Sequence, residues 1–302
     1  MSKGVTSIRL ERLYEMKRLL GLLLLSAAAS FWLLAAAPSS ADDNDTVTVV
    51  TAPLAAKAQV CYDVDHGEDV RVDVVLETKT YGLDKAQVRT LVMLCELSTV
   101  HTFPIPDYTF VTVAPSPPPV ADTSIFACYA LRGGDNAGMG AHLKTVSFGK
   151  DTVTVGTSNI MCESAKKHVT NRDGSVSTYG VSTNNILQCF KLANGDNPNL
   201  AVSFANNNFG SDVVTTGKGI GLCEEGVKYR DINGQTEITG MANGVAYECF
   251  DVADWADDEQ KAVVLETENF GRDKVIVRKA TQICQLADKA DFHIVTAYPW
   301  QP

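Results

Sequence analysis

The chain has 302 residues, of which 45% are hydrophobic and 21% are charged, a balance typical of a folded globular protein that excludes wholesale disorder. Its formal net charge is −10, and the part after residue 41 is more acidic still, because residues 1–41 hold five basic and two acidic side chains. An acidic chain without clustered Lys and Arg is unsuited to a phosphate backbone, so nucleic acid is excluded as a partner.

The N-terminal segment has the pattern of a secretory signal peptide. Lys17 and Arg18 form a positive flank, an apolar run follows from Leu19 to Ala37, and small residues lead up to Ala41. We therefore predict export, with cleavage after Ala41. The alternative is an uncleaved anchor, because 19 apolar residues can span a bilayer. No second apolar run of that length follows, so we expect no membrane span after cleavage.

Eight cysteines reveal an internal repeat in the rest of the chain. They form four pairs whose members are 34, 34, 34 and 35 residues apart, and successive pairs begin 67, 61 and 60 residues after one another. Each first cysteine is followed by an aromatic residue, and the residue before each second cysteine is apolar. The pairs are Cys61 and Cys95, Cys128 and Cys162, Cys189 and Cys223, and Cys249 and Cys284.

A second motif, aromatic-Gly-x-Asp, lies between the two cysteines of every copy, and its glycine precedes the second cysteine by 13 residues. The motif is typical of a hairpin turn, in which glycine supplies a positive φ and aspartate closes the turn through its carboxylate. The predicted turn glycines are Gly82, Gly149, Gly210 and Gly271. The predicted turn aspartates are Asp84, Asp151, Asp212 and Asp273.

Apolar and polar residues alternate near this turn, as at Val72, Val74 and Leu76, and a period of two predicts strands with one buried face. No segment after residue 41 has a long helical period. We therefore predict an all-β protein built from four tandem, three-stranded, disulfide-stapled repeats of about 60 residues. Because one small sheet cannot cover its own apolar face, we expect the repeats to pack sheet on sheet, as one body or as two domains.

The constant cysteine spacing predicts one disulfide within each repeat. A unit of this size buries too little apolar surface to be stable alone, and an exported protein can compensate with disulfides. The alternative is structural zinc, which usually takes closely spaced cysteine pairs, and the sequence has none.

The connecting segments differ in character. The first contains six prolines, which makes it stiff and extended, whereas the later two are polar and are interpreted as turns. The predicted organisation in chain order is a signal peptide over 1–41 with translation starting at Met16, an N-terminal extension over 42–60, repeat 1 over 61–100, a Pro-rich linker over 101–124, repeat 2 over 125–170, a linker over 171–185, repeat 3 over 186–230, a linker over 231–245, and repeat 4 with a closing strand over 246–302.

The sequence contains no recognised catalytic motif, such as a Gly-x-Ser-x-Gly elbow, a His-Glu-x-x-His zinc helix or a dinucleotide fingerprint. We predict no catalytic residue, no cofactor and no metal. The turn aspartates are interpreted as structural, because a hydrolytic site seldom recurs identically in every repeat. Two acidic segments faintly resemble a calcium loop but lack its full set of ligands. Their weak candidate ligands are Asp63, Asp65, Asp254 and Asp257.

The tandem Cys-aromatic, Phe-Gly and apolar-Cys motifs behind a signal peptide resemble an uncharacterised family of exported bacterial repeat domains, a domain of unknown function. Members of that family have Cys-Tyr-x-Val, Asp-Gln-Phe-Gly and Leu-Cys-x-Pro-x-x-Lys, and the likeness runs from Cys61 to Lys289. This chain lacks the Gln of the second motif and the Pro of the third, although Lys166, Lys228 and Lys289 lie near the expected basic position. The resemblance implies the repeat architecture and no activity or ligand.

Together these features predict an exported, non-enzymatic protein of the periplasm, the cell surface or the medium. Rigid repeated units offer broad surfaces, so we expect either a surface binding role, with an unknown protein or glycan as ligand, or a structural role. Two alternatives stay open: a secreted hydrolase with a site between repeats, and a calcium-dependent adhesive module. Different polar residues converging between repeats would favour the hydrolase.

Overall fold

The computed structural model describes residues 56–104, 124–206, 209–254 and 257–293. The signal peptide with Met16, residues 42–55, most of the Pro-rich linker and the end of the closing strand lie outside them. Within the described residues the protein is all β and has no helix, so the predicted fold class is confirmed. In the same part of the chain, no helix is long and apolar enough to cross a membrane.

Each repeat contributes a first strand, a second strand and a long third strand. The first strands are β1 (Ala56–Asp65), β4 (Ile125–Arg132), β8 (Ile186–Ala193) and β12 (Ala246–Asp254). The second strands are β2 (Asp69–Thr78), β5 (Asn136–Thr145), β9 (Leu200–Asn206) and β13 (Lys261–Thr267). The third strands are β3 (Gly82–Pro104), β6 (Gly149–Thr170), β10 (Gly210–Ile232) and β14 (Gly271–His293).

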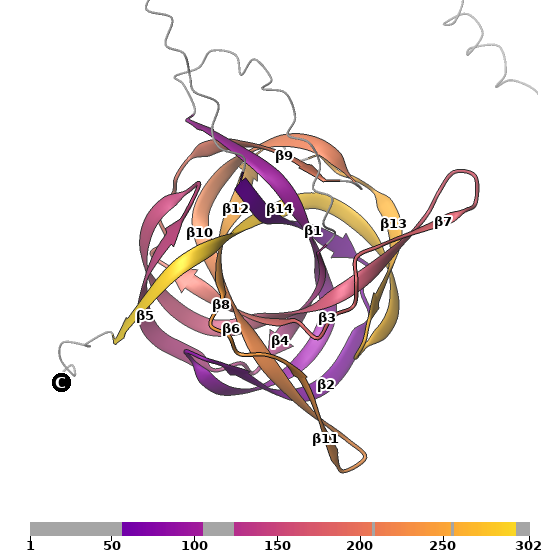
Figure 1. The fold of residues 1–302 in the computed structure, drawn as a ribbon, viewed down its shortest axis with the longest axis horizontal. Helices are drawn as coiled ribbons and strands as arrows, with labels where there is room; N and C mark the ends of the chain where they lie inside the picture. Colours follow the sequence, from indigo (N-terminus) through magenta and orange to yellow (C-terminus); the bar gives the residue numbers. More distant parts are fainter. Residues whose placement is uncertain (1–55, 105–123, 207–208, 255–256, 294–302) are drawn as a thin grey trace, which may run out of the picture. The chain divides into compact units, whose positions relative to one another are not determined.

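The two linkers interpreted as turns each contain a further strand. β7 (Val176–Tyr179) pairs with the end of β6, and β11 (Gln235–Gly240) pairs with the end of β10. The long third strands therefore fold back on themselves, and the two hairpins project outward from the rest of the sheet (Figure 1). The turn before β11 is an Asn-Gly dipeptide, Asn233 and Gly234, with both φ values positive, as a tight hairpin requires.

The third strands close the repeats into a ring. Each third strand pairs with the first strand of its own repeat, as β3 does with β1, and with the first strand of the next repeat, as β3 does with β4. At the end of the series, β14 pairs antiparallel with β1, so repeat 4 joins repeat 1. Figure 1 shows the strands running around a central axis.

Repeats on opposite sides of this ring also pair with each other, third strand against second strand. After pairing with the first strands, β3 continues along β9 of repeat 3, and β10 continues along β2 of repeat 1. Repeats 2 and 4 do the same through the pairs β6–β13 and β14–β5. Every repeat is therefore hydrogen-bonded to the other three, and the 14 strands of the described residues form one connected sheet.

The disulfides join the first and third strands of each repeat, in the pairing that the spacing predicts. The bonds are Cys61–Cys95, Cys128–Cys162, Cys189–Cys223 and Cys249–Cys284. Because no cysteine is free, the zinc alternative has no thiolate ligands available. Four disulfides indicate an oxidising, exported compartment.

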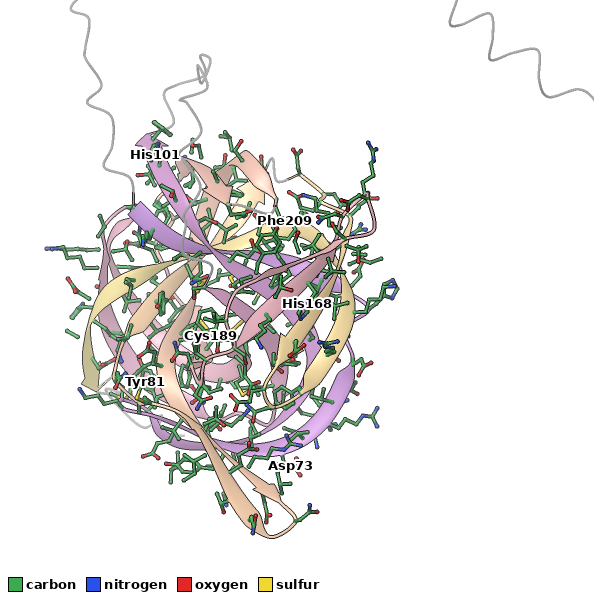
Figure 2. The ribbon with its side chains drawn as sticks, turned by 45° about the vertical axis from the view of Figure 1, so that its right-hand side comes forward. Asp73, Tyr81, His101, His168, Cys189 and Phe209 are labelled. Carbon is green, nitrogen blue, oxygen red and sulfur yellow. A yellow bond between two sulfur atoms is a disulfide. The ribbon has the colours of Figure 1, made fainter. Side chains whose placement is uncertain are left out.

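Aromatic pairs hold opposite repeats together. The aromatic residue after each first cysteine packs against the turn aromatic of the repeat two positions away, with ring centroids 4.4–4.7 Å apart. The pairs are Tyr62 with Phe209, Tyr129 with Phe270, Phe190 with Tyr81, and Phe250 with Phe148. Contacts of this kind add about 0.5–1.5 kcal/mol each beyond the area they bury. Figure 2 shows Cys189 in the interior and Asp73 at the outer surface.

Candidate functional site

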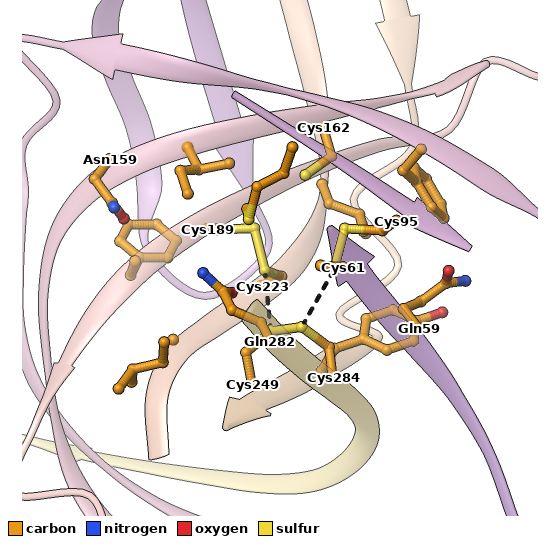
Figure 3. A pocket seen from close by; sticks show the side chains of 18 of the residues that line it. Gln59, Cys61, Cys95, Asn159, Cys162, Cys189, Cys223, Cys249, Gln282 and Cys284 are labelled. Carbon is orange, nitrogen blue, oxygen red and sulfur yellow. Dashed lines mark hydrogen bonds between the residues drawn. A yellow bond between two sulfur atoms is a disulfide. The ribbon is translucent and has the colours of Figure 1, made fainter. Parts of the chain in front are cut away.

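The four disulfides meet at the centre of the ring, where seven of the eight cysteines line a cavity of about 280 Å³ (Figure 3). Disulfides of neighbouring repeats touch one another. Their sulfur atoms are 3.6 Å apart for Cys95 and Cys128, 3.8 Å for Cys223 and Cys249, and 4.0 Å for Cys61 and Cys284. The staples predicted separately for each repeat therefore form one shared wall.

Strand alternation explains why the cysteines face inward. A cysteine and the aromatic residue after it point to opposite faces of the strand. In repeat 1, Tyr62 belongs to the large hydrophobic core, whereas Cys61 belongs to a separate buried cluster that contains all eight cysteines. The sequence shows this alternation, but the meeting of the cysteines depends on ring closure, which has no local signal.

The cavity wall is chemically soft and almost uncharged. Besides the sulfur atoms it contains Met93, Phe126, Ile160, Leu187 and Tyr247. Three amide side chains also reach the cavity, and Lys191 is the one charged residue among the described lining residues; the amides are Gln59, Asn159 and Gln282. Thioether, disulfide and aromatic groups are polarizable and pack well against apolar or aromatic ligands.

The turn aspartates do not close their own turns, and this corrects the sequence prediction. Each carboxylate instead accepts a backbone N–H from the next repeat. These four hydrogen bonds, one at each junction between consecutive repeats, clasp the ring together. The bonds run from Asp135 to Asp84 (2.8 Å), from Asp196 to Asp151 (2.9 Å), from Asp257 to Asp212 (3.0 Å) and from Glu68 to Asp273 (2.8 Å). Burial raises the pKa of three of these carboxyl groups, those of Asp84, Asp212 and Asp273.

A different side chain closes each turn. This side chain lies three positions before the turn aromatic, and its oxygen accepts the backbone N–H of the turn aromatic at 2.7–3.1 Å. These acceptors are Thr78, Thr145, Asn206 and Thr267. The turn glycines have φ values of 73°, 91°, 83° and 76°, as the turn requires of Gly82, Gly149, Gly210 and Gly271.

Three buried ion pairs form where three repeats meet, and sequence reasoning missed them. They are Lys167 with Glu96, Lys228 with Glu163, and Lys289 with Glu224. Each ammonium also lies 4.2–4.8 Å from the ring centroid of a turn aromatic in a third repeat: Phe209, Phe270 and Tyr81 respectively. Burial lowers the pKa of Lys167 and Lys228 and raises the pKa of Glu163.

In repeat 2 the buried lysine is Lys167 and not Lys166, which the family resemblance placed near the basic position. The Lys166 side chain is 42% exposed, whereas that of Lys167 is 0% exposed. Adjacent residues of a strand face opposite ways, so a shift by one position exchanges solvent for core.

The weak calcium candidates do not form a site. Asp63 is exposed and accepts a hydrogen bond from the Thr281 hydroxyl at 2.9 Å, and Asp65 lies 3.4 Å from Arg278. Asp257 is exposed and donates its N–H to Asp212, and the Asp254 side chain is outside the described residues. In the part of the chain that the structure describes, no three His, Cys, Asp or Glu residues are grouped to hold a metal.

Comparison of the chain with family models, with curated proteins and with solved structures finds no match.

Proposed function

We propose that this protein is an exported, non-enzymatic binding protein whose disulfide-lined central cavity takes a small, neutral, apolar ligand. The observation that supports this is the cavity of about 280 Å³, with walls made of disulfides, Met93, Phe126 and Leu187. We place the protein in the periplasm, at the cell surface or in the medium, where disulfides persist.

The size and rigidity of the cavity suit a ligand of one or two aromatic rings. An apolar protein cavity of roughly 150 Å³ stays dry and accepts benzene. The present cavity is larger, at about 280 Å³, and its walls are fixed by covalent bonds between strands. A pre-formed wall lowers the ordering cost of binding, which leaves more of the apolar contact energy for affinity.

The chemistry of the wall favours binding over catalysis. Its described residues include no carboxylate, no histidine and no serine, and its cysteines are oxidised. Acid–base catalysis needs a titratable group within hydrogen-bond reach of the reacting atom. Lys191 alone offers no partner for such a step.

Titration of the oxidised protein with the neutral two-ring fluorophore 1-naphthylamine tests this proposal. We expect saturable binding of one molecule per chain. Replacing the half-buried lining residue Ile160 with Trp should fill the cavity and abolish binding, whereas Ile238→Trp, at a side chain that is 63% exposed on β11, should leave it unchanged. A second filling variant, Leu187→Phe, covers the case that Ile160→Trp fails to fold. No binding by the wild-type protein, or unchanged binding by the filled variants, would refute the proposal.

A further inference from the structure

A second pocket lies where repeats 2, 3 and 4 meet. It has a volume of about 260 Å³ and is lined by Asp151 at the start of β6, Asp196 in the loop before β9 and Glu248 in β12. Three acidic residues from three repeats thus converge, although these residues are far apart in sequence.

Two of these carboxyl groups are buried with unpaired oxygens. Glu248 is 0% exposed and Asp151 is 4% exposed. Both oxygens of Glu248 and Oδ1 of Asp151 accept no hydrogen bond from a donor of the protein, although the two carboxyl groups lie within hydrogen-bond reach of each other, whereas Oδ2 of Asp151 accepts the N–H of Asp196 at 2.9 Å. Burying a carboxylate without a partner costs free energy, so a cation or a hydrogen-bond donor bound to these oxygens would stabilise the fold.

Gly219 in β10 leaves a hollow beside both carboxyl groups. A Cβ atom at this position would lie 2.9 Å from Asp151 Oδ2 and 3.3 Å from Glu248 Oε1. Oxygens of the two side chains therefore face the same small space. Any larger residue at position 219 would fill it.

At the equivalent place one repeat earlier, the protein itself supplies a hydrogen-bond donor to the buried carboxylate. There, Gln188 stands in the place of Glu248 and Ser158 in the place of Gly219, because each has the same spacing from its cysteine. The Gln188 Nε2 group donates to Asp84 Oδ2 at 2.6 Å and to the Ser158 hydroxyl at 2.9 Å. Exchange of Gln for Glu and of Ser for Gly removes the donors and leaves room for an external one.

Within the described parts of the chain, no basic side chain neutralises the pocket. Lys150 is among its lining residues but is exposed, and no ion pair to Asp151 or Glu248 exists among the described residues. The remaining titratable group at the pocket is Asp196, which adds negative charge.

We propose that the hollow between Asp151, Glu248 and Gly219 binds a hard divalent cation, Mg²⁺ or Ca²⁺, with water completing its coordination shell. Carboxylate and water oxygens are the ligands these ions prefer, and Mg²⁺ commonly binds through one or two carboxylates. A single shared proton would pair two of the three free oxygens and leave the third unpaired. Hydrolysis is a poorer use of the pair, because Glu248 is 0% exposed and only a species as small as an ion could reach it.

Melting temperatures of the full oxidised chain test the proposal at pH 8.5. Samples in EDTA are compared with samples in MgCl₂, in CaCl₂, or in NaCl of equal ionic strength. We expect a rise of roughly 5–10 °C when the cation is at a hundredfold excess over its Kd, and no rise in NaCl. The magnesium and calcium arms show which ion is preferred, and calorimetric titration should give one site per chain.

Variants distinguish cation binding at this site from general screening of the protein's negative charge by salt. Glu248→Gln should raise the melting temperature in EDTA and remove the response to divalent ions. Gly219→Ser keeps both carboxyl groups but fills the hollow, and it should also remove the response. The control Asp63→Asn alters an exposed carboxylate outside the site and should retain it. A wild-type protein without a divalent shift, or Glu248→Gln with the full shift, would overturn the proposal.

Discussion

Val100 and Gln285 occupy, at the junction of repeats 4 and 1, the two positions that form a buried ion pair at the other three junctions of the ring. At each of those three junctions, the glutamate after a second cysteine pairs with a lysine of the next repeat. Both charges are absent together, so no buried charge is left alone. Gln285 still bonds the turn of repeat 2, accepting the N–H of Ser147 at 2.8 Å.

The buried pair of Glu163 and Lys228 should behave as a unit. Replacing Lys228 with Val leaves a buried carboxylate beside Asn269, and we expect the free energy of unfolding to fall by about 3–5 kcal/mol. Adding Glu163→Gln reproduces the neutral combination of Gln285 and Val100 and should recover most of this loss. Urea denaturation of both single variants and of the double variant measures the coupling. Additive losses would contradict the interpretation.

Stability should depend on pH through Glu248. Its pKa is about 8 in the folded protein and near 4.5 when solvated, so the folded state binds more protons between these values. The free energy of unfolding therefore falls as pH rises through this window, by up to about 1.4 kcal/mol per pH unit from this group, and levels off above it.

The variant Glu248→Gln isolates this contribution from the other titrating groups. Its stability advantage over the wild type should be small near pH 5 and grow until pH 8, as followed by urea denaturation without divalent ions. The reverse exchange at the matched position, Gln188→Glu, places a carboxylate beside Asp84 and should introduce a new dependence of the same sign. An advantage of Glu248→Gln that does not vary with pH would argue against the raised pKa.

Each disulfide should contribute separately to stability. Replacing Cys128 and Cys162 with Ala opens a loop of about 35 residues, for which chain entropy predicts a loss of roughly 3–4 kcal/mol. Urea denaturation of the variant measures the loss. Peptide mapping without reductant should find the four bonds within repeats in the wild-type protein. Bonds between repeats in native material would contradict the structure.

The clasp formed by Asp273 should be detectable at a single amide. Asp273→Ala removes the acceptor of the Glu68 N–H, and we expect that amide to exchange with solvent much faster and the protein to lose about 1–3 kcal/mol of stability. Hydrogen exchange followed by NMR or mass spectrometry checks this. The exposed Asp73 offers a matched control, Asp73→Ala, that should leave the Glu68 amide protected. An aspartate that closed its own turn would leave exchange at Glu68 unaffected.

The sequence predicts features whose causes are local. The cysteine spacing, the turn glycines and the alternation at Val74 and Leu76 act within one repeat, so the repeat, its disulfide and its strands follow from them. The Thr three residues before a turn aromatic is also a local signal, because the order Thr-x-x-aromatic-Gly lies within one repeat and indicates that the Thr hydroxyl is the turn acceptor.

The remaining features arise from contacts between repeats. The carboxylate of Asp84 bonds a residue 51 positions away, and Glu163 meets Lys228 at a separation of 65. A sequence of one repeat contains no information on which neighbour supplies the partner. The central cavity needs the closure of β14 on β1, which is a property of the whole chain, and the Glu248 pocket needs repeats 2, 3 and 4 to meet.

The pairing of strands across the ring fixes the number of repeats. In an open array a unit can be duplicated at either end without disturbing the others. Here, an inserted fifth unit would separate pairs such as β3 and β9 or β2 and β10, which now face one another from opposite repeats. We therefore expect natural variation in this architecture to change loops and individual side chains while the count of units stays constant.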